Sequence, residues 1–157
     1  MGPVEGAMAV DIVKVESEKM LSGMVDAACE LGAMVSGGAV DPDVMRANLA
    51  MMIASDAYEI YAATVGDRVL GLVAVHYYDS VTEPRLCARI SEMVIRADMQ
   101  GSGVSRDLVN AAAMAARVHG AGSLEVAADS DDDARVEFLH GLGFGDWQIL
   151  FKMDLGG

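Results

Sequence analysis

The segment QGSGVS at residues 100–105 decides how this chain is organised, because it joins a strand-like run to a helical pattern. The run before it, LCARISEMVI at 86–95, is rich in strand-forming residues, and the pattern after it, from about Gly103 to His119, is helical. Backbone N–H groups and the positive end of a helix meet at such a junction and can hold an anion. The segment therefore predicts an anion-binding turn within an α/β fold.

Two familiar nucleotide motifs do not fit this turn. A P-loop needs Gly-Lys-Ser/Thr after its spacer, and a dinucleotide fingerprint needs a third glycine where Arg106 stands. The Gly-x-Gly pattern alone is also compatible with an ordinary strand-to-helix turn. From these residues by themselves, both interpretations stay open.

Upstream of the turn, the sequence predicts one strand followed by two helices. Residues 8–15 alternate as a strand, and Ser17 with Glu18 begins an apolar-periodic helix that reaches about Ala33. The glycines after Ser36 break this helix. Asp41-Pro42 then opens a second helix through Met51, with proline at an early helical position.

The remaining elements complete a mixed sheet. Gly66-Asp67 is a short turn that joins two β-rich runs, 58–65 and 68–78, into an antiparallel hairpin. The last predicted elements are a strand at 123–128, a helix at 131–141 and a strand at 147–154. The order β-α-α-β-β-β-α-β-α-β, without repeat or linker, predicts a single α/β domain over residues 1–157.

Composition limits the class of protein. The chain of 157 residues is 53% apolar, enough for one core, but it has no apolar run long enough for a membrane span. No targeting signal stands out, so a cytoplasmic location is expected. The net charge of −13 disfavours nucleic acid as a partner. This charge either keeps the protein soluble or gathers a cationic substrate, and both readings stay open.

No metal is expected. The three histidines lack ligand spacing such as HExxH, and Cys29 and Cys87 belong to different predicted elements, where they fit as small buried residues. The run DSDDD at 129–133 lacks the glycine and final glutamate of a calcium loop. A helix-capping acidic loop is the favoured interpretation of this run.

The wider sequence resembles the GNAT N-acetyltransferases, whose motif is Arg/Gln-x-x-Gly-x-Gly/Ala. Here the motif reads Gln100-x-x-Gly103-x-Ser105. The resemblance covers about residues 58–155, including ISEMVI at 90–95 and FLHGLGF at 138–144. It implies a GNAT-like fold with a mostly antiparallel mixed sheet, acetyl-CoA as co-substrate and a small-molecule primary amine as acceptor. Dimers are common in this family, so a homodimer is a possible state, although no interface signature stands out.

The resemblance also implies where acetyl-CoA binds. Amides around 101–106 would receive the pyrophosphate, and residues 93–95 would pair with the pantetheine arm. A bulge in this strand would expose the Val94 amide or a neighbouring amide to the thioester carbonyl. The implied cofactor-binding residues are Met93, Val94, Ile95, Gln100, Gly101, Ser102, Gly103, Val104, Ser105 and Arg106.

Glu92 is the candidate general base, because a carboxylate on this strand can take the proton that an amine must lose before it attacks. A strand has a side-chain period of two, so Glu92 is expected to share a partly apolar face with Ile90 and Val94, where its pKa would rise. The alternative is an exposed acid or one paired with an arginine, for which Arg89 and Arg68 are available.

One departure from the family pattern concerns the general acid. Leu139 stands where many members carry a tyrosine that protonates the leaving thiolate, and leucine has no proton to give. Tyr77 or Tyr78 could replace it, or turnover could proceed without an acid. A non-catalytic acyl-CoA-binding regulatory module and a protein N-terminal or lysine acetyltransferase remain as alternative functions.

Overall fold

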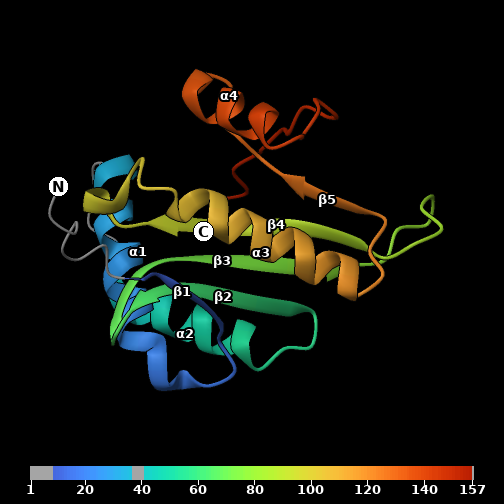
Figure 1. The fold of residues 1–157 in the computed structure, drawn as a ribbon. Helices are drawn as coiled ribbons and strands as arrows, with labels where there is room; N and C mark the ends of the chain where they lie inside the picture. Colours follow the sequence, from blue (N-terminus) through green and yellow to red (C-terminus); the bar gives the residue numbers. More distant parts are fainter. Residues whose placement is uncertain (1–8, 37–40, 157) are drawn as a thin grey trace, which may run out of the picture. The chain divides into compact units, whose positions relative to one another are not determined.

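The computed structural model describes residues 9–36 and 41–156 and divides the chain into two compact units, 1–125 and 126–157. The first unit contains the elements from β1 to α3 and residues 123–125 of β5, and Figure 1 labels the strands and α-helices. In order they are β1 (Asp11–Lys14), η1 (Glu18–Met20), α1 (Leu21–Ser36), α2 (Pro42–Ile53), β2 (Tyr58–Val65), β3 (Arg68–Tyr78), β4 (Cys87–Ile95), η2 (Ala97–Met99), α3 (Val104–Val118), β5 (Ser123–Val126) and α4 (Asp133–Gly141).

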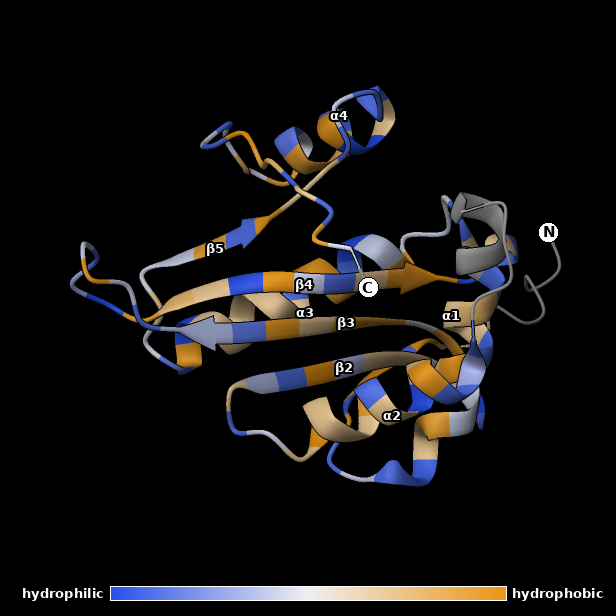
Figure 2. Cartoon of the chain, turned by 180° about the vertical axis from the view of Figure 1, so that it is seen from behind, coloured by the Kyte–Doolittle hydropathy of each residue, from blue (hydrophilic) through white to orange (hydrophobic). Residues whose placement is uncertain are grey.

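The sheet is mixed, which confirms the predicted α/β class. Its strands lie in the order β1-β2-β3-β4-β5, and the first four pair antiparallel. The β2–β3 hairpin turns at Gly66, whose φ of 56° lies in the left-handed region that a two-residue turn requires. β5 runs in the same direction as β4, to which α3 connects it (Figure 2).

Helices cover both faces of this sheet (Figure 1). α1 and α2 pack on one face, over a core that includes Ile60, Leu72 and Val94. α3 packs on the other face through a buried stripe at helical spacing: Val104, Leu108, Val109, Ala112, Ala115 and Ala116. Successive residues of each central strand therefore point to opposite faces of the sheet. We call these the α1/α2 face and the α3 face, after the helices that pack on them.

A polar cluster lies on the α3 face. The carboxylate of Glu59 is buried, accepts a hydrogen bond of 2.8 Å from the Tyr61 hydroxyl and lies 3.4 Å from Lys14 Nζ. His119, at the end of α3, places Nε2 2.9 Å from Glu59 Oε1 and Nδ1 3.1 Å from the Ala115 carbonyl. Burial, together with the Glu59 carboxylate, raises the pKa of Tyr61 well above its usual value. The cluster anchors the end of α3 to β2.

The second unit contains α4, and its acidic entry is a helix cap as predicted. The Asp132 carboxylate accepts a hydrogen bond of 3.1 Å from the Arg135 N–H. The strand predicted at 147–154 is wrong, because this segment has no regular secondary structure and pairs with no described strand. The apolar residues of this segment do alternate, but a strand also needs a neighbouring strand edge to pair with. Trp147 and Phe151 are 77% and 87% exposed, so the alternating side chains are not packed as those of a strand would be.

Several boundaries differ from the sequence prediction by a few residues. β1 begins at Asp11, β4 at Cys87 and α4 at Asp133. The expected strand start at Met8 and the glycine break at 37–38 lie outside the described residues. In the part of the chain that is described, none of the helices combines the length and apolar character needed to span a bilayer.

Candidate functional site

β4 contains a bulge at the point where the candidate base lies. Ala74 of β3 pairs with Glu92, but Val75 pairs with Ile90, so Ser91 is an extra residue. The Ser91 hydroxyl lies 3.4 Å from the Ala74 carbonyl, to which it donates. Such a bulge bends the strand and breaks its hydrogen-bond ladder. The expected interruption of this strand is therefore present, and it precedes residues 93–95.

The bulge corrects one expectation about Glu92. Its register opposite Ala74 puts it on the α1/α2 face with Val94, whereas Ile90 pairs with Val75 and points to the α3 face. Glu92 and Ile90 do not share a face, because the extra residue shifts the side-chain alternation by one.

The second half of β4 has an open edge within the first unit. Gly122 N–H donates to the Leu86 carbonyl at 2.9 Å, and β5 is only four residues long, so β5 accompanies just the first part of β4. Both ribbon views show β5 as a much shorter strand than β4 (Figures 1 and 2). Among the described residues of this unit, 93–95 have β3 as their strand neighbour on one side and none on the other.

The backbone groups of 93–95 alternate between these two edges. Arg96 N–H donates to the Leu70 carbonyl at 2.8 Å. Because antiparallel pairing alternates, residue Val94 also directs its N–H and C=O toward β3, while Met93 and Ile95 direct theirs to the open edge. The Ile95 carbonyl accepts a hydrogen bond of 3.2 Å from Gln100 Nε2. Two backbone N–H groups and one carbonyl are thus available along this edge.

The glycine turn leads from β4 into α3. Gly101 and Gly103 have φ of 75° and 91°, and nothing lies within 4 Å of a Cβ placed on either one, so glycine is needed there for conformation rather than space. The first intrahelical bond runs from Asp107 N–H to the Gly103 carbonyl. The N–H groups of 104–106 therefore have no acceptor within the helix and point out of its positive end.

Side chains around the turn divide into engaged and available groups. Gln100 is engaged with Ile95, and the Ser102 hydroxyl donates to the Met99 carbonyl. Arg106 is exposed in the first turn of α3 and forms no ion pair within the described ranges. Arg68, in contrast, is engaged: it pairs with Asp98 and holds the pKa of the Asp98 carboxyl below its usual value. Arg106 is thus a cation close to the helix amides that a bound anion can use.

Glu92 is an exposed side chain, yet surrounding protein atoms partly desolvate its carboxyl and raise its pKa. Neither of the arginines considered as partners pairs with it: Arg89 binds Glu125 through Nε and Nη2 at 2.9 and 2.7 Å, and Arg68 binds Asp98. In the described structure Glu92 has no ion pair. A carboxylate of this kind is suited to accept a proton.

The candidate acids lie in different surroundings. Leu139 is buried in α4, and the His140 Nε2 lies 2.7 Å from Asp146 Oδ1. The Tyr77 side chain is on the α3 face, 7% exposed, and burial followed by the Glu59 charge raises its pKa to about 12. The Tyr78 hydroxyl donates to Glu125 Oε2 at 2.8 Å. Of the two tyrosines, Tyr78 alone shares the α1/α2 face with Glu92.

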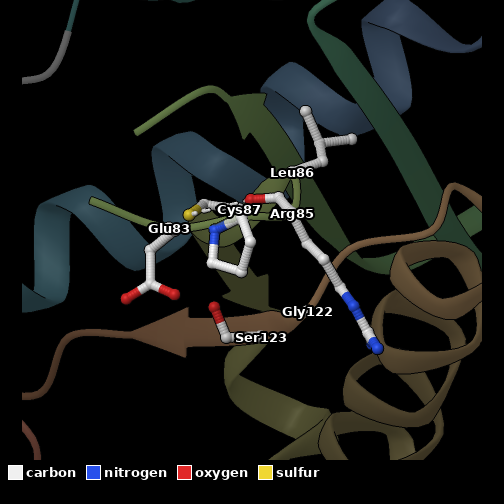
Figure 3. Close-up of a pocket in the computed structure, with 7 residues that line it drawn as sticks. Glu83, Arg85, Leu86, Cys87, Gly122 and Ser123 are labelled. Carbon is white, nitrogen blue, oxygen red and sulfur yellow. Dashed lines mark hydrogen bonds between the residues drawn. The ribbon is translucent and has the colours of Figure 1, made fainter. Parts of the chain in front are cut away.

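Two pockets lie away from Glu92 and the glycine turn. One, of about 310 Å³, lies between the start of β4 and the start of β5, where Figure 3 shows Glu83, Arg85, Cys87 and Ser123. The other, of about 410 Å³, is lined by Lys14, Glu59 and His119 among others. Across the described residues, no group of three or more His, Cys, Asp or Glu side chains is placed to hold a metal.

Sequence reasoning missed a row of stacked rings on the α1/α2 face. Tyr58 stacks on His76 at 4.6 Å between ring centroids, and His76 stacks on Tyr78 at 5.7 Å. The only available signal was the two-residue hairpin turn, which brings the start of β2 near the end of β3 without giving their exact register.

Comparison with known proteins gives a family. Residues 25–152 match the family described as "Acetyltransferase (GNAT) domain", which covers most of the chain and spans both units. A comparison with curated proteins found no match.

Solved structures share the fold at low sequence identity. The aminoglycoside N-acetyltransferase AAC(6')-Iy in complex with CoA has a TM-score of 0.81 at 13% identity, covering 98% of this chain and 99% of that one. The integron cassette protein VCH_CASS6 from the mobile metagenome of V. cholerae has a TM-score of 0.79 at 19% identity, with 96% and 94% covered. The aminoglycoside acetyltransferase meta-AAC0020 from an uncultured soil metagenomic sample, in complex with sisomicin, has a TM-score of 0.77 at 14% identity, with 94% and 97% covered.

Proposed function

The chain belongs to the GNAT acetyltransferase family, which uses acetyl-CoA, and on that premise we propose that it acetylates the primary amine of a small cationic acceptor by direct attack in a ternary complex. The observation that carries this proposal is the open edge of β4 at 93–95, which leads through the glycine turn to the unbonded amides of α3. Two sets of free backbone donors thus lie on one segment of the chain: the N–H groups of Met93 and Ile95 next to the candidate base, and those of 104–106 at the helix N-terminus.

These groups fit the parts of acetyl-CoA, which supplies an activated acetyl thioester. Met93 and Ile95 offer backbone groups to the amides of the pantetheine arm, and Val94 holds this edge in place through β3. The residues Gly101, Ser102, Gly103, Val104, Ser105 and Arg106 form the pyrophosphate site, with Gln100 fixing the turn to β4. Positive φ at the glycines and unbonded helix amides suit an anion.

The oxyanion donor is a neighbour of Val94 rather than Val94 itself. The alternation of the ladder turns the Val94 N–H toward β3 and leaves the Met93 N–H on the open edge just after the bulge. A donor aimed at the developing oxyanion contributes about 3–4 kcal/mol to transition-state stabilisation. We assign this role to Met93.

Glu92 acts as general base in this proposal. The attacking amine must lose a proton, and the Glu92 carboxylate accepts it directly or through one water. Partial desolvation raises the pKa of Glu92, which makes it a stronger base than an ordinary surface carboxylate. No general acid is assigned, because a thiolate leaves without protonation near neutral pH.

The acceptor is proposed to be cationic because of long-range charge. A net charge of −13 attracts cations to the protein surface and repels polyanions. Solved structures with the same fold include aminoglycoside acetyltransferases, one of them bound to sisomicin. Acetylation of a protein N-terminus or lysine is the competing outcome of an acceptor screen.

The first experiment is a thermal-shift and calorimetric titration with acetyl-CoA, with NADH and ATP as controls. A ligand that binds only the folded state at 100 times its Kd stabilises it by about 2.7 kcal/mol. Selective stabilisation by acetyl-CoA is expected. No response at millimolar acetyl-CoA contradicts the cofactor site.

The second experiment tests the base. Glu92→Gln is expected to lower kcat by about 10²–10⁴-fold and to flatten the acidic limb of the pH–rate profile. Glu18→Gln, at an exposed glutamate in η1, is the matched control and is expected to leave both unchanged. An unchanged rate and pH profile for Glu92→Gln would remove Glu92 from the mechanism.

A further inference from the structure

The row of rings on the α1/α2 face has no role in the site described so far. It consists of Tyr58 of β2 with His76 and Tyr78 of β3, stacked with interplanar angles of 21° and 25°. Tyr58 and His76 are cross-strand partners, and all three side chains are half-buried. Stacking between two tyrosines holds the His76 ring in one plane.

This row lies beside the candidate base. Glu92 is the cross-strand partner of Ala74, and His76 is the next residue of β3 on the same face. Same-face diagonal neighbours in an antiparallel sheet lie about 7–8 Å apart. In Figure 2, α1 crosses one end of β3 and β4 and α2 follows β2, so within the first unit neither helix covers the half of these strands that carries the row.

Charged side chains hold one end of this row. The Arg89 guanidinium lies over the Tyr78 ring, 5.5 Å from the ring centroid. Glu125 then fixes both groups, because it accepts hydrogen bonds from Arg89 and from the Tyr78 hydroxyl. Besides its stacked faces, the row therefore has polar ring edges.

Two of those edges have unused hydrogen-bonding groups. Among the described residues, neither the His76 ring nitrogens nor the Tyr58 hydroxyl forms a hydrogen bond, although the same structure engages both nitrogens of His119 with Glu59 and Ala115. A neutral imidazole offers one donor and one acceptor. Such a fixed pair suits a hydroxyl group, which also donates and accepts.

We infer that His76 is a specificity-determining residue of the acceptor site, where it binds a hydroxyl group of a hydroxylated primary amine whose nitrogen lies at Glu92. This inference rests on the proposed function and narrows its acceptor class. Tyr58 and Tyr78 hold the imidazole in position, and the Arg89–Glu125 pair holds Tyr78. Amines without hydroxyl groups lack the partner that His76 recognises.

The test compares His76→Phe with His119→Phe. Phenylalanine keeps a ring in the stack but removes both nitrogens, and His119 is the matched control because it also stacks on a tyrosine, Tyr77, at 4.5 Å. Acetyl-CoA affinity and Tm are measured for each variant. Initial rates are measured with kanamycin and glucosamine as hydroxylated amines and with spermidine and cyclohexylamine as amines without hydroxyl groups.

The wild type is expected to acetylate at least one of the two hydroxylated amines with a higher kcat/KM than either amine without hydroxyl groups. His76→Phe is expected to raise KM for that probe about 3- to 10-fold, the effect of one hydrogen bond, with kcat and acetyl-CoA affinity kept. His119→Phe is expected to leave KM unchanged. Selectivity is the readout that a merely structural role would not move.

Three results overturn the inference. The first is equal KM for wild type and His76→Phe, and the second is an equal rise in KM for amines with and without hydroxyl groups. The third is normal binding of acetyl-CoA without acetylation of either hydroxylated probe. Absence of acetyl-CoA binding is a distinct result that overturns the proposed function, and this inference with it.

Discussion

Gly71→Ala should loosen the strand proposed to hold acetyl-CoA. Gly71 pairs with Ile95, and a Cβ at Gly71 would lie 2.6 Å from the Val94 carbonyl oxygen and 2.9 Å from Ile95 Cδ1. Overpacking of this kind costs about 1–3 kcal/mol, and the lower chain entropy of unfolded alanine offsets about 0.5–1 kcal/mol. Because the nearest clash is with a backbone oxygen, which cannot move aside cheaply, the cost lies in the upper half of this range and the net loss is about 1–2.5 kcal/mol.

Thermal unfolding and acetyl-CoA titration measure the two consequences. At about 2–4 °C per kcal/mol for a chain of this size, Tm should fall by about 2–10 °C. Acetyl-CoA affinity should fall as well, because the strands must separate beside Met93. Gly122→Ala is the control, since the nearest atoms to its Cβ would be Cβ and Cδ of the exposed Arg85 at 3.1 Å, and no backbone atom is among its nearest neighbours. If Gly71→Ala melted at or above the wild-type temperature, the close approach of β3 and β4 would be refuted.

Three more changes test the charges of the first unit. Arg106→Gln should weaken acetyl-CoA binding about 2- to 5-fold by calorimetry, as expected for an exposed charge, while Arg117→Gln at the other end of α3 should not. Glu92→Gln should raise the urea midpoint at pH 7, since desolvation raises the folded pKa and ionised Glu92 then destabilises the fold; this gain should vanish below the unfolded carboxyl pKa. Tyr61→Phe should lower the free energy of unfolding by about 1.5–3 kcal/mol in urea, because Glu59 loses a donor.

The β4–turn–α3 unit could be predicted from sequence because its signals are local. Strand-forming residues, two glycines and a helical apolar pattern follow one another within one segment, and the structure places them as β4, the turn and α3. Gly101 and Gly103 adopt positive φ, a conformation that glycine tolerates better than other residues. The assignment of individual residues to acetyl-CoA stays a prediction.

The pairing registers of β2 with β3 and of β3 with β4 could not be predicted, because the local sequence pattern does not show where a bulge occurs. If the hydrogen-bond ladder continued without interruption from the Gly66-Asp67 turn, Tyr58 would pair with Val75. A bulge near Thr64 moves the partner to His76 and so creates the ring row. The bulge at Ser91 likewise separates Glu92 from Ile90. One extra residue in a strand moves every later side chain to the other face.

The predicted strand at 147–154 failed for a different reason. Its alternating apolar residues satisfy the side-chain period of a strand, but pairing depends on an edge that other parts of the chain must present. A pattern within one segment carries no information about that edge.

The open edge of β4 also affects how this protein behaves in the test tube. Within the first unit this edge has unpaired backbone groups, and a strand edge of this kind is a template on which another chain can add a strand and aggregate. Met93 and Ile95 carry no charge that would discourage this. Protein purified without acetyl-CoA should therefore associate and precipitate more readily than protein kept with it, so that the co-substrate also acts as a solubilising agent.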